Sequence, residues 1–140
     1  MSIEADQIYD IIGPDGFKSL VAGFYARVAT DDLLRLLYPE EDLAPAERRL
    51  RLFLQQYFGG PTTYSIERGH PRLRARHMPF KIDQMARDRW MQHMGDSLEE
   101  QDFPDEVKAI MRDYFEQGAT FLMNHHPTEG GMFTTKRENN

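Results

Sequence analysis

The sequence predicts an all-α protein with four substantial helices and two or three short ones. Apolar residues recur at spacings of three and four positions in separate stretches, as in helices with one buried face. No segment alternates polar and apolar residues convincingly with a period of two, and glycine or proline punctuates the chain between the stretches. With 140 residues, no internal repeat and no linker, the chain fits one domain over residues 1–127. Residues 128–140 lack periodicity and are expected to form a flexible tail.

The first helix is predicted from an apolar stripe that follows Asp15, and Asp15 is its expected N-cap. The stripe consists of Phe17, Leu20, Val21, Phe24 and Val28. Thr30-Asp31-Asp32 interrupts this helix. A short helix is expected over residues 31–37, and it should end before Pro39.

Three more stripes predict the remaining long helices. The second helix carries Leu50, Phe53, Leu54 and Tyr57, and Gly59-Gly60-Pro61 ends it. The third carries Ile82, Met85, Ala86, Trp90, Met94 and Leu98. The longest carries Val107, Ile110, Met111, Tyr114, Gly118, Phe121, Leu122 and His125. Asp102 and Pro104 should start this last helix, and Pro127 should stop it.

Residues 59–82 differ from the rest, because Gly69, Pro71 and Pro79 break any long helix there. About 20 residues without regular structure are unusual in a compact domain unless they serve a function. The segment also carries apolar side chains, among them Ile66, Leu73, Met78, Phe80 and Ile82. We therefore expect it to line a site for an apolar ligand.

Composition excludes several classes of function. The chain has no cysteine, which excludes disulfides, thiolate metal sites and cysteine nucleophiles. A net charge of −6 argues against nucleic acid and anionic membranes as partners, and no apolar run reaches the ~20 residues that a membrane span needs. Because the N-terminus lacks the basic and apolar order of a signal peptide, a cytoplasmic protein is expected. Phosphate-binding glycine motifs and the GxSxG motif are absent.

Basic residues are concentrated in one window of this acidic chain. Between residues 48 and 81 there are eight Lys or Arg, at positions 48, 49, 51, 68, 72, 74, 76 and 81, and one acid, Glu67. The window indicates either a local anionic partner, such as a carboxylate or phosphate, or a solvated charged face.

His77 stands out among the histidines because it should end a short helical turn with its ring free to point inward. Histidine is the commonest metal ligand among side chains, although a surface or capping role fits the spacing as well. Of the others, His70 is expected in a loop, His93 in a structural role, and His125 and His126 in solvent.

Three aromatic residues with a polar atom form a second group: Tyr25, Tyr38 and Trp90. Each combines an apolar body with one hydrogen-bond donor, so each needs a partner if it is buried. They are either ordinary core residues or donors to a ligand.

The chain resembles the group II truncated haemoglobins, of the subgroup found in actinobacteria and related bacteria. The matching segments are FYARVATDDLLRLLYPEEDL (24–43), AERRLRLFLQQYFGGPTTYSIERGHPRLRARHMPFKI (46–82) and DRWM (88–91). The Phe-Tyr pair, the YPE stop, the GGP break and the RGHPRLRxRHxPF run occur in the family's order and spacing. The resemblance implies a truncated globin domain, with a two-over-two helical sandwich around haem b.

The resemblance also implies roles for single residues. His77 matches the proximal iron ligand, while Tyr25, Tyr38 and Trp90 match groups on the distal, ligand-binding side. Ala46 falls where many globins place a distal histidine, and Phe24 precedes the first distal tyrosine. Residues implied to form the apolar wall or to approach the haem are Leu50, Phe53, Leu54, Leu73 and Phe80. Arg76, Arg49 and Tyr64 match groups that meet the haem propionates. The family usually has a Gly-Gly pair between its first two helices, whereas this chain has Gly13-Pro14-Asp15-Gly16.

By this resemblance the protein binds O₂ reversibly at ferrous haem iron and releases it slowly, and its other ligands are NO and CO. Slow release suits NO dioxygenation or peroxide turnover with an unidentified reductase. The alternatives are an oxygen carrier, store or sensor, or a helical module without haem that binds an anionic partner through the arginine-rich loop. The sequence leaves open whether the protein is a monomer or a homodimer.

Overall fold

The computed structural model describes residues 2–125, and this part of the chain is helical, with no strand. The long helices are α1 (Ile8–Val28), α2 (Ala44–Tyr57), α5 (Gln84–Glu100) and α6 (Asp105–Phe121). The short ones are α3 (Thr63–Arg68), α4 (Leu73–His77) and the 3₁₀ turns η1 (Ala5–Gln7) and η2 (Arg35–Leu37). The all-α prediction is therefore confirmed. His126, Pro127 and the expected tail lie outside the described residues.

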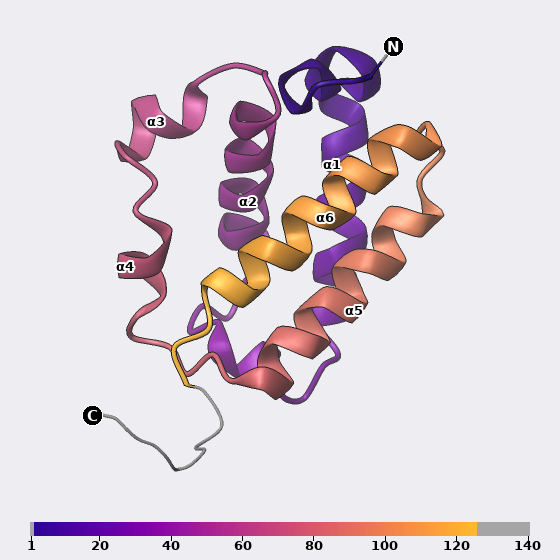
Figure 1. Ribbon diagram of the computed structural model, residues 1–140. Helices are drawn as coiled ribbons and strands as arrows, with labels where there is room; N and C mark the ends of the chain where they lie inside the picture. Colours follow the sequence, from indigo (N-terminus) through magenta and orange to yellow (C-terminus); the bar gives the residue numbers. More distant parts are fainter. Residues whose placement is uncertain (1, 126–140) are drawn as a thin grey trace, which may run out of the picture.

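The four long helices pack as two pairs, α1 with α2 and α5 with α6, and α1 against α5 joins the pairs. Figure 1 shows α5 and α6 side by side and the α3–α4 segment along the opposite edge of the molecule. The pairs approach closely where Gly23 of α1 meets Ser97 of α5. A Cβ atom at Gly23 would lie 2.4 Å from the Ser97 hydroxyl oxygen, so this crossing requires glycine.

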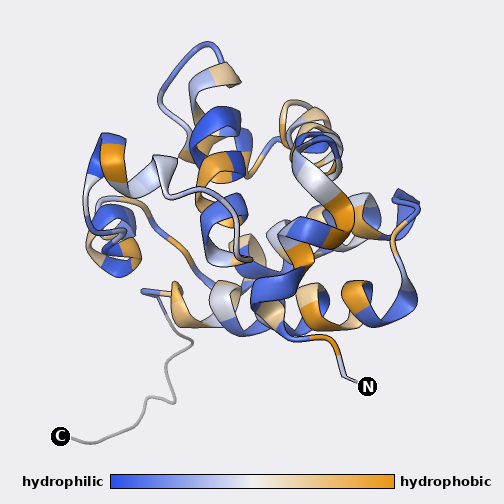
Figure 2. Cartoon of the chain, turned by 90° about the horizontal axis from the view of Figure 1, so that it is seen from above, coloured by the Kyte–Doolittle hydropathy of each residue, from blue (hydrophilic) through white to orange (hydrophobic). Residues whose placement is uncertain are grey.

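The core lies between the two pairs and contains all of the first predicted stripe. It contains only part of the later stripes, of which Tyr57, Met85 and Phe121 are exposed. Its largest fully buried side chains include Phe17, Phe24, Phe58, Phe115, Met94, Leu98 and Met111. Each buried side chain of this size contributes roughly 1.5–3 kcal/mol relative to an exposed one. In Figure 2 the apolar colour appears as bands on one face of a helix, alternating with polar positions.

The start of the first helix differs from the prediction. Gly13, with φ 70° and ψ 172°, interrupts α1, and Pro14 follows as the first residue of the longer segment. Proline disfavours helical geometry in the residue before it but is well suited to begin a helix. Asp15 therefore lies inside the helical segment and is not its N-cap.

Three other boundaries differ from the prediction. The expected helix over residues 31–37 is only the turn η2. The Asp31 carboxylate accepts from the N–H groups of Leu33 and Leu34, as an N-cap does, and the backbone is extended at Tyr38, directly before Pro39. Residues 59–82 contain two short helices, α3 and α4, separated at Gly69, whose φ is 78°. The last helix begins after Pro104 but ends at Phe121, so His125 is not on it.

Among the described residues, no helix is long and apolar enough to cross a membrane.

Candidate functional site

His77 is the last residue of α4, as the sequence predicts, and its ring is half-buried. Nδ1 lies 2.7 Å from the backbone oxygen of Leu73. A carbonyl oxygen only accepts hydrogen bonds, so Nδ1 carries the proton and the lone pair of Nε2 is left to bind a metal. No group of three or more His, Asp or Glu side chains gathers for a metal among residues 2–125. The geometry therefore suits one imidazole bound to a metal that brings its other ligands with it.

The segment around His77 is tied to the end of α6 by Asn124. The side-chain amide of Asn124 donates to the backbone oxygens of His77 (3.2 Å) and Phe80 (2.8 Å). Its oxygen accepts from the Ile82 N–H at 2.8 Å, and its own backbone N–H donates to the Ile82 oxygen at 2.9 Å. One residue thus fixes both the position of His77 and the end of the loop that follows.

Apolar side chains near this segment are less buried than those of the core. Leu50, Phe53, Leu73 and Phe80 are only partly buried. Large apolar residues exposed on the bordering elements are Tyr57, Ile66, Met78 and Phe121. Such a concentration of apolar surface indicates that an apolar ligand or partner covers it. By contrast, Leu54 and Ala46 are buried within the core cluster.

The basic window is partly paired within the chain. Arg76 donates to the backbone oxygens of Pro71 (2.7 Å) and Arg68 (3.0 Å), while Arg49 pairs with Glu40 at 2.9 Å. Arg48 makes a bidentate pair with Glu67, which is the one acid in the window. Tyr64 is buried with its ring edge-on to Phe53, at 5.5 Å between centroids. The contacts of Arg76, Arg49 and Tyr64 with propionates stay predictions.

The four aromatic residues expected on the distal side form one contiguous group. The Trp90 ring lies 5.1 Å from that of Phe24, and Phe24 lies 4.9 Å from Tyr25. Tyr25 lies 5.6 Å from Tyr38, measured between ring centroids. Residues from α1, from the loop after η2 and from α5 are thereby brought together, with Ala46 in the same cluster of buried and half-buried residues.

Both tyrosines of this group keep their protons at neutral pH. Burial raises the pKa of Tyr25 well above its usual value, and Tyr38 raises it further. Burial also raises the pKa of Tyr38, against a lowering by Tyr25 and Arg49. A neutral phenol offers an O–H donor, whereas a phenolate would act as a metal ligand. The group therefore keeps two phenolic O–H groups, which share a hydrogen bond, and the indole N–H of Trp90.

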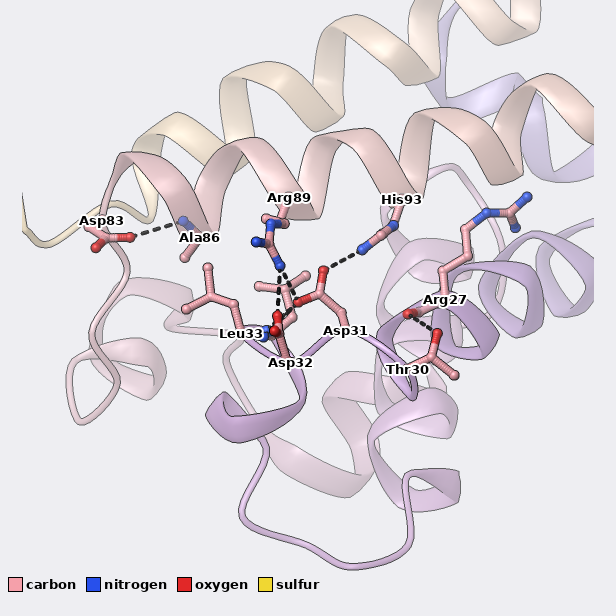
Figure 3. A network of polar contacts seen from close by, with 10 residues as sticks. Arg27, Thr30, Asp31, Asp32, Leu33, Asp83, Ala86, Arg89 and His93 are labelled. Carbon is pink, nitrogen blue, oxygen red and sulfur yellow. Dashed lines mark hydrogen bonds and ion pairs between the residues drawn. The ribbon is translucent and has the colours of Figure 1, made fainter.

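A polar network joins the turn after α1 to α5 (Figure 3). Asp31, whose side chain is 3% exposed, lies 2.6 Å from Nε2 of His93 and 2.9 Å from the Arg89 guanidinium. His93, for which a structural role is expected, thus joins α5 to the turn after α1. The exposed Asp32 also contacts Arg89, at 3.2 Å.

Comparison with known proteins decides the family. The bacterial-like globin family matches residues 7–124. Group 2 truncated hemoglobin YjbI of Bacillus subtilis is 37% identical over 121 residues, which cover 86% of this chain and 91% of that protein. The chain belongs to the group II truncated haemoglobins. Two-on-two hemoglobin-3 of Arabidopsis thaliana is 31% identical, over 87% of this chain and 71% of that protein.

Solved structures show the same truncated haemoglobin fold. The hemoglobin of Chloroflexus aurantiacus is 49% identical, with a TM-score of 0.82 over 84% of this chain and 98% of that one. A thermostable hemoglobin from Thermobifida fusca is 47% identical, with a TM-score of 0.81 over 83% of this chain and 95% of that one. The truncated oxygen-avid haemoglobin of Bacillus subtilis is 38% identical, with a TM-score of 0.79 over 83% of this chain and 98% of that one.

Family membership implies a haem cofactor and the binding of diatomic ligands. The donor set fits haem in two observed respects: one imidazole with Nε2 available, and apolar side chains left partly exposed beside it.

Two residues of this truncated haemoglobin were not identified from the sequence as parts of the site. Asp31 appears in the sequence only as part of a helix interruption, and Asn124 lies between Leu122 and His125 of the last predicted stripe without belonging to it. An Asp directly after a helix is a weak signal for a residue that accepts backbone N–H groups. No local signal identifies Asn124, because its partners lie 42 to 47 positions earlier.

Proposed function

We propose that the protein binds haem b through His77 and holds O₂ with slow release, and that it uses the bound O₂ in redox chemistry. The observation that carries the proposal is the group of Tyr25, Tyr38 and Trp90, in which both phenols stay protonated. The family supplies the haem, and the residues of this chain supply the donors.

Each residue has a defined part in holding the cofactor. Nε2 of His77 would bind the iron, while Nδ1–H stays on Leu73 and fixes the plane of the ring. The walls would be formed by Leu50, Phe53, Leu54, Leu73 and Phe80. Arg76, Arg49 and Tyr64 would approach the propionates, and Arg49 would then exchange its pairing with Glu40 for a propionate.

Slow release follows from the number of donors. When bound, ferrous haem offers a sixth position that takes a diatomic ligand and places partial negative charge on it. The donors Tyr25, Tyr38 and Trp90 would each stabilise that charge by ~1–2 kcal/mol. Three such bonds slow release by a factor of hundreds or more. The description of the Bacillus subtilis relative as oxygen-avid supports this proposal.

A protein that releases O₂ slowly is suited to reacting with it, by oxidation of NO to nitrate. The alternative redox reaction is the turnover of peroxide, which would bind in place of O₂. The first reaction balances as NO + O₂ + e⁻ → NO₃⁻, so each turnover needs one electron. The proposal therefore includes a reductase partner, which the sequence does not identify.

The first test is the absorption spectrum of the purified protein, ferric, then reduced with dithionite, then under CO. We expect a Soret band that shifts sharply with CO. A colourless protein that fails to take up added hemin would contradict the proposal.

The second test separates catalysis from carriage or storage. The oxygenated protein is given repeated additions of NO in the presence of excess O₂ and a chemical reductant, and nitrate is measured. Nitrate formed in several-fold excess over the haem supports NO dioxygenation, because each turnover consumes one electron. Loss of O₂ without nitrate, together with no peroxide consumption, would favour an oxygen carrier, store or sensor.

A further inference from the structure

Asp31 is a buried carboxylate with an unusually complete set of partners. One of its oxygens accepts from the backbone N–H groups of Leu33 (2.8 Å) and Leu34 (2.9 Å) and from Arg89 (2.9 Å). The other lies 2.6 Å from Nε2 of His93. These contacts hold the carboxylate in place, because the loss of any one partner would leave a buried charge or a buried N–H group without its hydrogen bond.

The α5 side of this network is attached to Trp90. Arg89 and His93 lie one turn apart on α5, so both face Asp31, and Trp90 directly follows Arg89 (Figure 3). Trp90 places its ring toward Phe24 and Phe115, at 5.1 and 5.8 Å between centroids. The contacts with Asp31 therefore fix the position and the rotation of α5 at the turn that carries Trp90.

The other side of the network leads to Tyr38. The Asp31 backbone oxygen accepts from the Arg35 N–H at 3.0 Å. The Arg35 guanidinium donates to the Tyr38 backbone oxygen at 3.0 Å, and the Tyr38 N–H donates to the Arg35 backbone oxygen at 3.2 Å. This series of short-range bonds to Tyr38 begins at the Asp31 backbone oxygen, in the same turn that the Asp31 carboxylate holds through the N–H groups of Leu33 and Leu34.

We propose that Asp31 is a positioning residue that holds two distal donors, Trp90 and Tyr38, at a fixed separation. It does so by joining α5 to the turn after α1 through Arg89 and His93. This inference rests on the proposed function, since it requires that Trp90 and Tyr38 are donors to the ligand. The inference adds Asp31, a residue outside the ligand site, whose contacts keep Trp90 and Tyr38 at the separation at which both can donate to one ligand.

The test substitutes Asp31→Asn, with Asp32→Asn as the matched control. The control makes the same change in size and charge one residue away, where the side chain is 93% exposed. In the haem-loaded protein we measure the C–O stretching frequency of the CO complex and the O₂ dissociation rate. We expect Asp31→Asn to shift the frequency upward, as donors move away, and to raise the dissociation rate about fivefold. Asp32→Asn should leave both near the wild-type values.

A purely structural role for Asp31 predicts a different result. Asp31→Asn would then lower the melting temperature while the folded protein kept the wild-type C–O frequency and dissociation rate, and that would overturn the proposal. Equal effects of Asp31→Asn and Asp32→Asn would overturn it too, because they would indicate a general effect of charge.

A second pair of variants decides the matter if Asp31→Asn fails to fold. His93→Gln keeps an N–H donor toward Asp31, whereas His93→Leu has none. We expect His93→Leu to change the frequency and the rate, and His93→Gln to restore at least part of the change. Wild-type values in His93→Leu would overturn the proposal.

Failure of the proposed function is distinguishable from failure of this inference. If Trp90→Phe and Tyr38→Phe leave the C–O frequency unchanged, the donors themselves are wrong. If these variants shift it and Asp31→Asn does not, only the role of Asp31 is wrong.

Discussion

The ring of His77 is held by one short hydrogen bond that decides its chemistry. Because Nδ1 donates to Leu73, Nε2 is the basic nitrogen, and the bond increases its strength as a ligand. We predict that His77→Ala abolishes the stable five-coordinate ferrous haem spectrum. His70→Ala is the matched control, since His70 lies in the same segment but is exposed. A normal deoxy spectrum in His77→Ala would refute the assignment.

The donors of the distal group are predicted to act individually on O₂ release. Tyr25→Phe and Trp90→Phe should each raise the O₂ dissociation rate at least tenfold, the equivalent of one hydrogen bond of about 1.4 kcal/mol. Tyr25→Phe keeps the ring that packs edge-on against Phe24 and removes the Tyr25 hydroxyl together with its hydrogen bond to Tyr38. If stopped-flow measurement gives the wild-type O₂ dissociation rate for both variants, Tyr25 and Trp90 are not hydrogen-bond donors to the ligand.

At this scale the sequence predicted the residues with distinctive chemistry and missed those that act through contacts. His77 is recognisable because it stands in a family motif at the end of a short turn. Asp31 and Asn124 have ordinary types, and their importance lies in partners 42 to 62 positions away. Such pairings depend on how the helices pack, which no local pattern encodes.

At the scale of elements, α4 is short and depends on its attachments. Its five residues are too few to be stable as an isolated helix, and Asn124 provides its connection to the end of α6. We predict that Asn124→Asp speeds the loss of hemin several-fold, because a carboxylate cannot donate to the oxygens of His77 and Phe80. Transfer of hemin to a haem-free acceptor protein measures the rate.

Gln92→Glu is the control for this prediction. It makes the same change from amide to carboxylate at an exposed position of α5. If hemin loss from Asn124→Asp equals that from wild type, Asn124 does not support the proximal segment.

The break in α1 depends on one glycine. Nothing lies within 4 Å of the place that a Cβ atom would take at Gly13, so its φ of 70° alone makes a side chain unfavourable there. Gly118 also has open space where a Cβ atom would lie, but it is inside the helix α6. We predict that Gly13→Ala destabilises the protein by about 1–2 kcal/mol, whereas Gly118→Ala stabilises it by up to about 1 kcal/mol. Urea unfolding of the two variants measures the difference, and the same sign in both would contradict the explanation.

The periodic stripes predicted the four long helices because each helix has one face in the core. Helix ends were harder to predict, since they depend on tertiary contacts. The longer segment of α1 begins at Pro14 and not after Asp15, because Gly13 has non-helical dihedral angles. The turn η2 ends at Tyr38, where the backbone is extended before Pro39. Arg72, directly before α4, has a φ of 44°. Positive φ is uncommon for a residue other than glycine, so the sequence gives no signal for this conformation.

At the scale of the whole molecule, two packed helix pairs form the stable part, and the segment α3–α4 carries His77, the proposed haem ligand. The core of α1, α2, α5 and α6 is well packed, while the residues facing the haem segment keep apolar surface exposed. Haem binding should therefore contribute to stability by covering this surface. Asp31 contributes separately, by joining the two pairs through α1 and α5.

The contribution of Asp31 gives stability a defined dependence on pH. Burial by itself raises the pKa of this carboxyl, but the N–H groups of Leu34 and Leu33, with His93 and Arg89, hold it well below its usual range. The native pKa is thus lower than the unfolded value of about 3.9, so the stabilisation is fully present above that pH. It is lost as the pH falls below about 4 toward the native pKa, because the unfolded state then binds the proton more readily.

We therefore predict that Asp31→Asn lowers the free energy of unfolding by on the order of 2–3 kcal/mol at pH 7. The difference from wild type should shrink progressively below about pH 4. The groups that face Asp31 are Arg89, which stays charged over this range, His93 and the exposed Asp32. A loss confined to the range below about pH 4 belongs to a carboxyl group and not to an imidazole. Urea unfolding at pH 7, 5, 4 and 3 measures it, and a difference that stays constant down to pH 3 would show that the charge of Asp31 is not what joins the helices.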